Sequence, residues 1–211
     1  MSRKAGTVSE DTQKNLIKAA ISEFAEHGYQ KSSLRRICAK AGVTTGALYF
    51  FFEDKEDLFT SVVAPVTNNV LTLMKEHYET ELASDAEELI TDEREDVRAG
   101  EEFIEFYYRN KILVNIVLDN QEHPAVKEFF EQLTELMNRQ TILLLKTLAP
   151  DSSDSPIFNE CTVHWFSHML IDSVIHILSH DFDEPRAKEQ LKIITRFLRG
   201  GMLSLLSEST I

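Results

Sequence analysis

The densest group of side chains that could do chemistry is a histidine series in the segment 157–180. Four histidines and an aspartate recur at steps of four residues: His164, His168, Asp172, His176 and His180. Imidazole and carboxylate groups bind zinc or iron, and histidine also titrates near neutral pH. On a helix each step of four drifts about 40° around the axis, so all five cannot meet one ion. Only the pair His164 and His168 is a plausible ligand set, and it lacks a Glu-x-x-His pattern beside it. We predict no metal here, and effector or pH sensing and ordinary packing remain open.

Other reactive side chains lack the partners that catalysis needs. The sequence contains no glycine-rich phosphate loop, no GxSxG elbow and no HExxH pattern. Cys38 and Cys161 have neither CxxC spacing nor an evident histidine partner, which predicts buried free thiols. The paired glutamates at 87–88 and 101–102 lie in an acid-rich segment that is expected to be solvated. We therefore do not expect an enzyme.

Residues 32–59 predict a helix that ends in a tight turn. Ser32 or Ser33 can cap this helix by accepting a backbone N–H bond. Gly42 is expected to end it, because glycine takes a positive φ without a Cβ clash. The apolar residues at helical spacing, which form its buried face, are Leu34, Ile37, Cys38 and Ala41.

A second, short helix is predicted directly after the turn. Thr44 or Thr45 supplies its N-cap, and Val43 and Leu48 are expected to point inward. The residues left to face outward are Thr45, Gly46, Ala47, Tyr49 and Phe50. Such a helix, turn and helix suit the major groove of DNA.

Charge is distributed unevenly along the 211 residues. The net charge is −13, yet residues 1–52 hold eight lysines and arginines against four acidic residues. The remaining 159 residues carry a net charge of −17. A basic N-terminal part attracts phosphates, while an acidic remainder stays off the duplex. No apolar run approaches the roughly 18 residues of a membrane span, and no signal peptide is visible, so a cytoplasmic protein is expected.

The whole chain predicts an all-α fold of about nine helices. A first helix closes at Gly28, and Asp54 can cap a long fourth helix with Pro65 inside it, where a bend is expected. An acid-rich, exposed connector that merges into a helix is expected over residues 84–102. Pro124 opens a further helix, and residues 150–156 form a loop by composition. The helix over 157–180 is apolar on nearly every side, and the last one is capped by Asp183.

The N-terminal part resembles the TetR family of transcriptional regulators. The residues that carry the resemblance, over about residues 10–60, are Gly28-Tyr29, Ser32-Ser33, Ile37, Ala41-Gly42-Val43, Gly46, Leu48-Tyr49, Phe52, Lys55 and Leu58. The resemblance implies a helix-turn-helix DNA-binding domain over 1–53 and an effector-binding and dimerisation domain over 54–211. It implies a homodimeric, repressor-like regulator.

The resemblance also implies which residues contact double-stranded DNA. Arg35, Thr45, Gly46 and Tyr49 are expected to face the groove, while Ser33, Thr44 and Lys55 lie at helix N-termini within reach of phosphates. Phe50 and Phe51 stand where family members usually carry a tyrosine or histidine, and we expect their rings to face DNA. No cofactor is expected.

The C-terminal helices are expected to bind an unidentified small molecule and to form the dimer. The apolar segment 157–180 and the last helix would pack against the same pair in a second subunit, as a four-helix interface. The predicted pocket is lined by Phe106, Tyr107, Leu113, Ile116, His123, Phe130, Trp165, His168 and Asp172.

The predicted function is therefore a ligand-responsive repressor released from a palindromic operator. Two alternatives remain: a structural or nucleoid-associated DNA binder without an effector, and a helical-bundle metalloprotein that uses His164 and His168.

Overall fold

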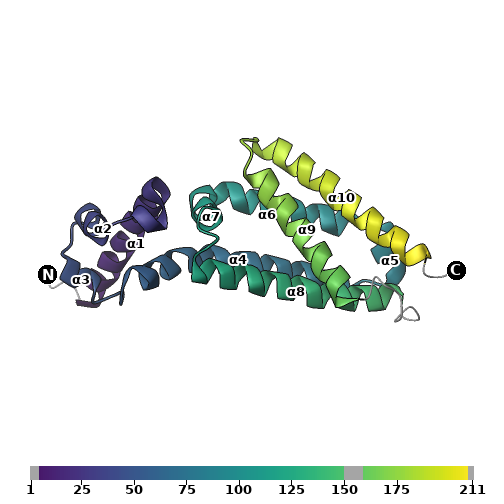
Figure 1. The fold of residues 1–211 in the computed structure, drawn as a ribbon, viewed down its shortest axis with the longest axis horizontal. Coiled ribbons are helices and arrows are strands. Elements are labelled where there is room, and N and C mark those ends of the chain that lie inside the picture. Colours follow the sequence, from purple (N-terminus) through teal and green to yellow (C-terminus); the bar gives the residue numbers. More distant parts are fainter. Residues whose placement is uncertain (1–4, 150–158, 209–211) are drawn as a thin grey trace. The chain divides into compact units, whose positions relative to one another are not determined.

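The computed structural model describes residues 5–149 and 159–208, which form ten helices and no strand. The helices, in chain order, are α1 (Ala5–Lys31), α2 (Leu34–Ala41), α3 (Thr45–Leu48), α4 (Lys55–Ala83), α5 (Ala86–Thr91), α6 (Arg94–Arg109), α7 (Lys111–Leu118), α8 (Pro124–Leu148), α9 (Glu160–Leu178) and α10 (Glu184–Glu208). The all-α prediction is confirmed for these residues (Figure 1).

The helices form two compact units. Unit 1 contains residues 1–68 and 110–127, and unit 2 contains residues 69–109 and 128–211. In unit 1, α1 packs against both α2 and α7; in unit 2, α10 packs against α6 and α9. These units group residues by packing, and the functional boundary between residues 53 and 54 remains a prediction.

Several helix ends follow the residues that the sequence singles out. The helical conformation of α1 is broken at Gly28, whose φ of 67° lies in the left-handed region. The backbone N–H of Asp57 donates to Asp54 Oδ1 at 2.9 Å, and that of Arg186 to Asp183 Oδ1 at 3.1 Å, so both predicted caps are present. Pro124 is the first residue of α8, where a missing N–H costs nothing.

The acidic stretch 84–102 merges into a helix as predicted, but it is already helical where an exposed connector was expected. Asp85 caps α5 by accepting the N–H of Glu88 at 2.9 Å, and Leu89 is buried. Arg94 then starts α6. Short capped helices need few apolar residues, which is why the composition concealed this one. The predicted loop at 150–156 and the first residues of the segment 157–180 lie outside the described residues.

Cysteine burial was predicted correctly at one of two positions. Cys38 is 2% exposed in α2, and burial raises the pKa of its thiol. Cys161, in the first turn of α9, is exposed, which corrects the prediction. None of the described helices is both long and apolar enough to cross a membrane.

Candidate nucleic-acid interface

The turn between α2 and α3 is built on a glycine in the left-handed conformation. Gly42 has φ 70° and ψ 29°, and the N–H of Val43 donates to the carbonyl of Cys38 at 3.0 Å. This pairing closes the last turn of α2. Thr44 then caps α3, because its Oγ1 accepts the N–H of Ala47 at 3.2 Å. The predicted turn and second cap are confirmed.

An apolar core holds the two helices at a fixed angle on α1. Ile37 of α2 and Leu48 of α3 are fully buried, and Phe24 of α1 is 2% exposed. The ring of Phe24 meets that of Phe59, from the start of α4, edge to face at 5.2 Å. We use the term head for helices α1, α2 and α3.

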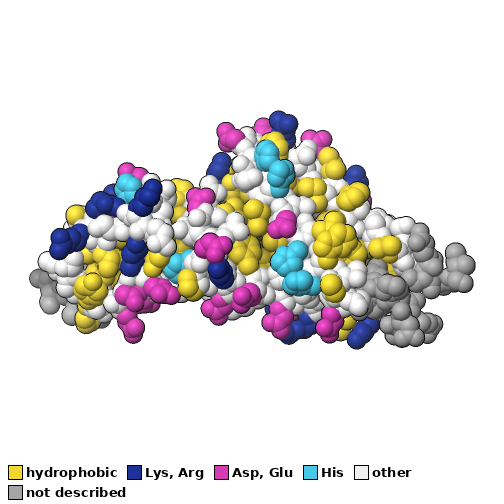
Figure 2. All heavy atoms as spheres, in the orientation of Figure 1, with side chains coloured by type: hydrophobic (Ala, Val, Ile, Leu, Met, Phe, Trp, Pro, Cys, Tyr) yellow, Lys and Arg dark blue, Asp and Glu magenta, His cyan; other side chains and the backbone are white. Residues whose placement is uncertain are grey.

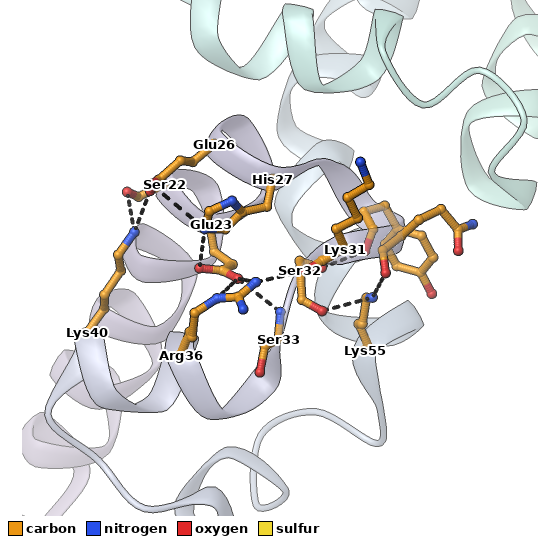
Figure 3. A network of polar contacts seen from close by, with 12 residues as sticks. Ser22, Glu23, Glu26, His27, Lys31, Ser32, Ser33, Arg36, Lys40 and Lys55 are labelled. Atoms are coloured by element: carbon orange, nitrogen blue, oxygen red, sulfur yellow. Dashed lines mark hydrogen bonds and ion pairs between the residues drawn. The ribbon is translucent and has the colours of Figure 1, made fainter.

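The buried carboxylate of Glu23, on α1, holds the start of α2 through hydrogen bonds (Figure 3). Glu23 is 0% exposed, and its Oε1 accepts both the Arg36 Nε–H at 2.7 Å and the backbone N–H of Ser33 at 3.0 Å. Burial opposes the charge, but the hydrogen bonds to Arg36 and Ser33 outweigh it and lower the pKa of Glu23. Lys40 adds an exposed ion pair to Glu26 at 3.2 Å.

The cap of α2 therefore differs from the prediction. Ser33 occupies the N-cap position but makes no side-chain cap bond, and Ser32 Oγ donates instead to the carbonyl of Tyr29 at 2.6 Å. The first-turn donor of α2 is satisfied by Glu23, ten residues earlier in the chain. A local serine pattern could not reveal this long-range partner.

Most of the predicted DNA-facing residues are exposed on one short stretch. Arg35, Thr44, Thr45 and Gly46 are exposed, and so are the rings of two aromatic residues. Those rings are Tyr49, 58% exposed, and Phe50, 77% exposed. Exposed lysine and arginine side chains gather on the visible face of the head (Figure 2). Large rings left in water are typical of an interaction surface, and a basic face is typical of a nucleic-acid binder.

Three of the predicted DNA-binding residues are less exposed, and one of them, Ser33, is half-buried with its backbone N–H donating to Glu23. Phe51 is half-buried and packs edge to face on Phe50, with ring centroids 5.1 Å apart. Lys55 Nζ donates to the carbonyls of Gln30 at 3.3 Å and Ser32 at 3.2 Å, and it lies 4.5 Å from the centroid of the Tyr29 ring. The ammonium group thus ties the segment between α1 and α2 to α4, so a phosphate contact at Lys55 would compete with these partners.

Comparison with known proteins identifies this arrangement. The model of the family described as "Bacterial regulatory proteins, tetR family" matches residues 16–62, from α1 into α4. Residues 16–62 of this chain thus match the DNA-binding part of the TetR family. The match contains α2, α3 and most of α1, and it includes Gly42, Thr44 and the exposed stretch after them.

Individual transcriptional regulators are similar to this chain over part of its length. The HTH-type transcriptional regulator AcrR of Shigella flexneri is 34% identical over 77 residues, which is 36% of each chain. The HTH-type transcriptional repressor BepR of Brucella suis is 41% identical over 61 residues, or 29% of each chain. The matches thus span about a third of the length of these two relatives.

The fold extends the likeness over most of the chain. SmeT, the repressor of the Stenotrophomonas maltophilia multidrug efflux pump SmeDEF, superimposes with a TM-score of 0.61. The alignment covers 90% of this chain and 91% of SmeT, at 21% identity. At that identity the comparison shows a shared TetR-family fold.

The residues predicted to bind an effector are divided between the two units. Leu113, Ile116 and His123 belong to unit 1, and the other six belong to unit 2. Within unit 2, Trp165, His168 and Asp172 are exposed on α9. Phe106 and Phe130 are half-buried, and Tyr107 is buried with its hydroxyl donating to the carbonyl of Leu178 at 3.4 Å.

Unit 2 contains a cavity of about 160 Å³ that the sequence did not indicate. Apolar residues of α8, α9 and α10, such as Met137, Phe166 and Met202, line much of it. None of the nine predicted effector residues is among its lining residues. The polar lining comes from His77, Glu81, Asp96, Ser167, Arg199 and two threonines.

The polar end of this cavity is electrostatically unusual. Glu81 is 8% exposed, and burial followed by the neighbouring Asp96 raises its pKa to about 8. Arg199 forms an ion pair with Asp96. One signal of this polar group is present in the sequence: His77 and Glu81 are four residues apart on one helix. Their partners lie on α6 and α10, far away in the sequence, so the rest of the group could not be predicted.

Proposed function

We propose that this chain is a homodimeric transcriptional regulator that binds operator DNA through its head and is released by a small molecule. The observation that carries the proposal is the turn at Gly42, which leads into a mostly exposed stretch over residues 44–50 that ends in two exposed aromatic rings, while Arg35 is exposed at the start of α2. The TetR-family match over the same residues supports it. Base contacts would come from Arg35, Thr45, Gly46 and Tyr49, with Ser33 and Thr44 near phosphates.

Dimerisation is proposed through α9 and α10. Both helices belong to unit 2 and pack on each other, yet they leave large apolar side chains in water. Trp165 of α9 is 58% exposed, and Ile193 and Phe197 of α10 are 53% and 74% exposed. Ile193 and Phe197 are four residues apart, so they share one face of α10. A two-fold axis would bury this stripe against its own copy.

Release follows from the geometry of paired recognition helices. In helix-turn-helix dimers the two helices enter successive major grooves about 34–36 Å apart, so the operator is palindromic and tolerates little change in separation. A ligand that binds one separation more tightly shifts the population toward it. Helix α4 provides the covalent connection, because it starts beside the head and ends in unit 2.

The proposal is tested by selecting binding sites from random double-stranded DNA with the full-length protein. We expect palindromic sequences, one of them upstream of the protein's own gene, that bind in 150 mM salt at least 1,000-fold more tightly than competitor DNA, on the order typical of specific regulators. Equal affinity for all duplexes would contradict a sequence-specific regulator. Hydrophobic and aromatic compounds are then added to the complex, and a structural DNA binder would stay bound with every compound.

A further inference from the structure

His77, Glu81 and Asp96 bring three metal-ligating atoms together in unit 2. We call these residues the triad. His77 Nε2 lies 3.5 Å from Glu81 Oε2 and 3.8 Å from Asp96 Oδ1, and the three ligand atoms lie within 4.8 Å of one another. His77 and Glu81 are one helical turn apart on α4, and Asp96 comes from the first turn of α6. The spacing therefore depends on the packing of two helices.

The two distances from His77 Nε2 to the carboxylates are longer than ordinary hydrogen bonds and suit two ligands of a shared ion. N–H···O bonds are about 2.7–3.2 Å long. A tetrahedral or trigonal ion about 2.0–2.2 Å from each ligand separates those ligands by about 3.3–3.8 Å. Within the described residues, the second ring nitrogen of His77, Nδ1, is buried without a hydrogen-bond partner. A largely buried imidazole whose Nδ1 has no hydrogen-bond partner is costly unless something binds it.

A second observation in the same cavity points to an occupant. Ser167, on α9, lines this cavity and is 3% exposed, and its Oγ is buried without a hydrogen-bond partner among the described residues. The cavity volume of about 160 Å³ leaves room for waters or a small oxygen ligand beside an ion.

Arg199 orients the triad and does not occupy it. Its guanidinium forms an ion pair with Asp96 Oδ2, which leaves Oδ1 directed at His77. It also donates to the backbone carbonyls of Leu89 and Asp92, at 2.9 Å for the latter, which fixes its own position. Outer groups that hold a ligating carboxylate in this way are typical of metal sites.

We propose that the triad binds one divalent transition-metal ion of the zinc, manganese and iron class. One imidazole nitrogen with two carboxylate oxygens suits these ions, whereas calcium and magnesium prefer oxygen ligands alone. Three protein ligands leave coordination positions open toward the cavity. The site stands independently of DNA binding, and any effect of the ion on operator affinity would rest on the proposed function.

The test is a titration of chelator-stripped, full-length protein with Zn²⁺ in competition with a chromophoric chelator and without DNA. We expect one tight site per chain. His77→Gln and Glu81→Gln should each weaken it at least about 100-fold, more than loss of an outer-shell group does. The matched control replaces His164 and His168 by glutamine, since their rings form the exposed rival pair, 4.5 Å apart. That variant should keep the site.

Thermal unfolding and Co²⁺ absorption give independent readouts. Zn²⁺ should raise the melting temperature of the wild type and of the control variant but not of the two triad variants. Co²⁺ should give the visible absorption of a low-coordinate site in the same proteins. The proposal is overturned if the wild type binds no Zn²⁺ at micromolar concentration, if Glu81→Gln binds as tightly as the wild type, or if the control variant loses the site. None of these outcomes bears on the operator experiment.

Discussion

Individual residues of the head divide into those that face outward and those that hold the helices. Arg35 and Arg36 are neighbours on α2, yet only Arg36 is tied to the buried Glu23, with its Nη2 2.6 Å from Oε1. Arg35 is exposed at the start of the same helix. Arg35 is therefore the proposed DNA contact, and the adjacent Arg36 forms a structural ion pair.

Arg35→Ala should relax operator specificity more than it lowers non-specific affinity. A bidentate arginine–guanine contact is worth about 1–3 kcal/mol of discrimination, so the preference for the selected site should fall about 5- to 150-fold. Fluorescence anisotropy on matched and single-mismatch operators measures this. Arg139→Ala, which removes an exposed arginine paired with Glu135 in unit 2, is the charge-matched control. An equal loss on all sequences would show that Arg35 contacts only the backbone of DNA.

At the scale of elements, short helices here depend on single residues at their ends. Gly42 has open space where a Cβ would project, with no heavy atom within 4 Å. Its requirement for glycine is therefore conformational and not steric. Gly200, inside α10, has equally open surroundings and no positive φ, which makes it a matched comparison.

Gly42→Ala should lower the free energy of unfolding by about 1–2 kcal/mol, the cost of a left-handed conformation for a residue with a Cβ. Gly200→Ala should instead raise it by about 0.5–1 kcal/mol, because alanine favours a helix interior. Urea unfolding followed by circular dichroism measures both. If both variants shift in the same direction, the turn at Gly42 does not require a left-handed residue.

His123 should make the start of α8 sensitive to pH. Its Nδ1 accepts the N–H of Ala125 at 3.2 Å, and its ring packs on Tyr29 and Phe59 at 4.4 and 4.2 Å. Burial lowers the pKa of His123, although the charge of Glu56 opposes this shift. The folded state thus binds the proton less readily than the unfolded state, so this stabilisation is present above about pH 6.5 and is lost as the pH falls.

The measurement compares wild type with His123→Phe in urea unfolding at pH 7.5 and 5.5. We expect the wild type to lose more stability than the variant over this range, since phenylalanine keeps the ring contacts but cannot be protonated. His180→Phe, at an exposed position, should behave as the wild type does. Identical pH dependence in wild type and His123→Phe would mean that His123 is not the group that titrates.

Sequence reasoning succeeded where one residue decides a local geometry. Gly42, Thr44, Asp54 and Pro124 mark helix ends through their own backbone or side chain, and all four were predicted. It failed where a partner comes from elsewhere in the chain, as Glu23 does for α2. The triad escaped notice for the same reason, because helical spacing relates residues within one helix and not across α4 and α6.

At the scale of the whole molecule, the proposed dimer depends on apolar residues that one chain leaves uncovered. Phe197 is 74% exposed, the largest such value among the exposed apolar rings and side chains of α9 and α10. Phe197→Glu should weaken dimerisation at least about 100-fold, because buried aromatic anchors contribute about 2 kcal/mol or more and a charge would be buried against its copy.

Sedimentation velocity across a concentration series measures this change. Tyr49→Glu is the control, since it places the same charge on an exposed ring of the head and should leave the dimer intact. If wild type and Phe197→Glu sediment alike, α10 does not form the interface. Loss of operator binding in Phe197→Glu with the head still folded would connect assembly to function.

The contacts around Tyr29 affect how far the head can be moved to another protein. The N–H of Tyr29 donates to Asn120 Oδ1 at 3.2 Å, and its ring meets His123, so the end of α1 is covered by residues about 90 positions later. Unit 1 is thus discontinuous in sequence, with residues 110–127 as its second piece. A chimaeric regulator that contains only residues 1–68 of this chain would have the proposed DNA-binding surface. It would lack residues 110–127, which include the helix α7 that packs on α1. Transfer of DNA specificity to another regulator therefore requires both segments, 1–68 and 110–127. Alternatively, the recipient's own residues at the second segment must fit against Tyr29.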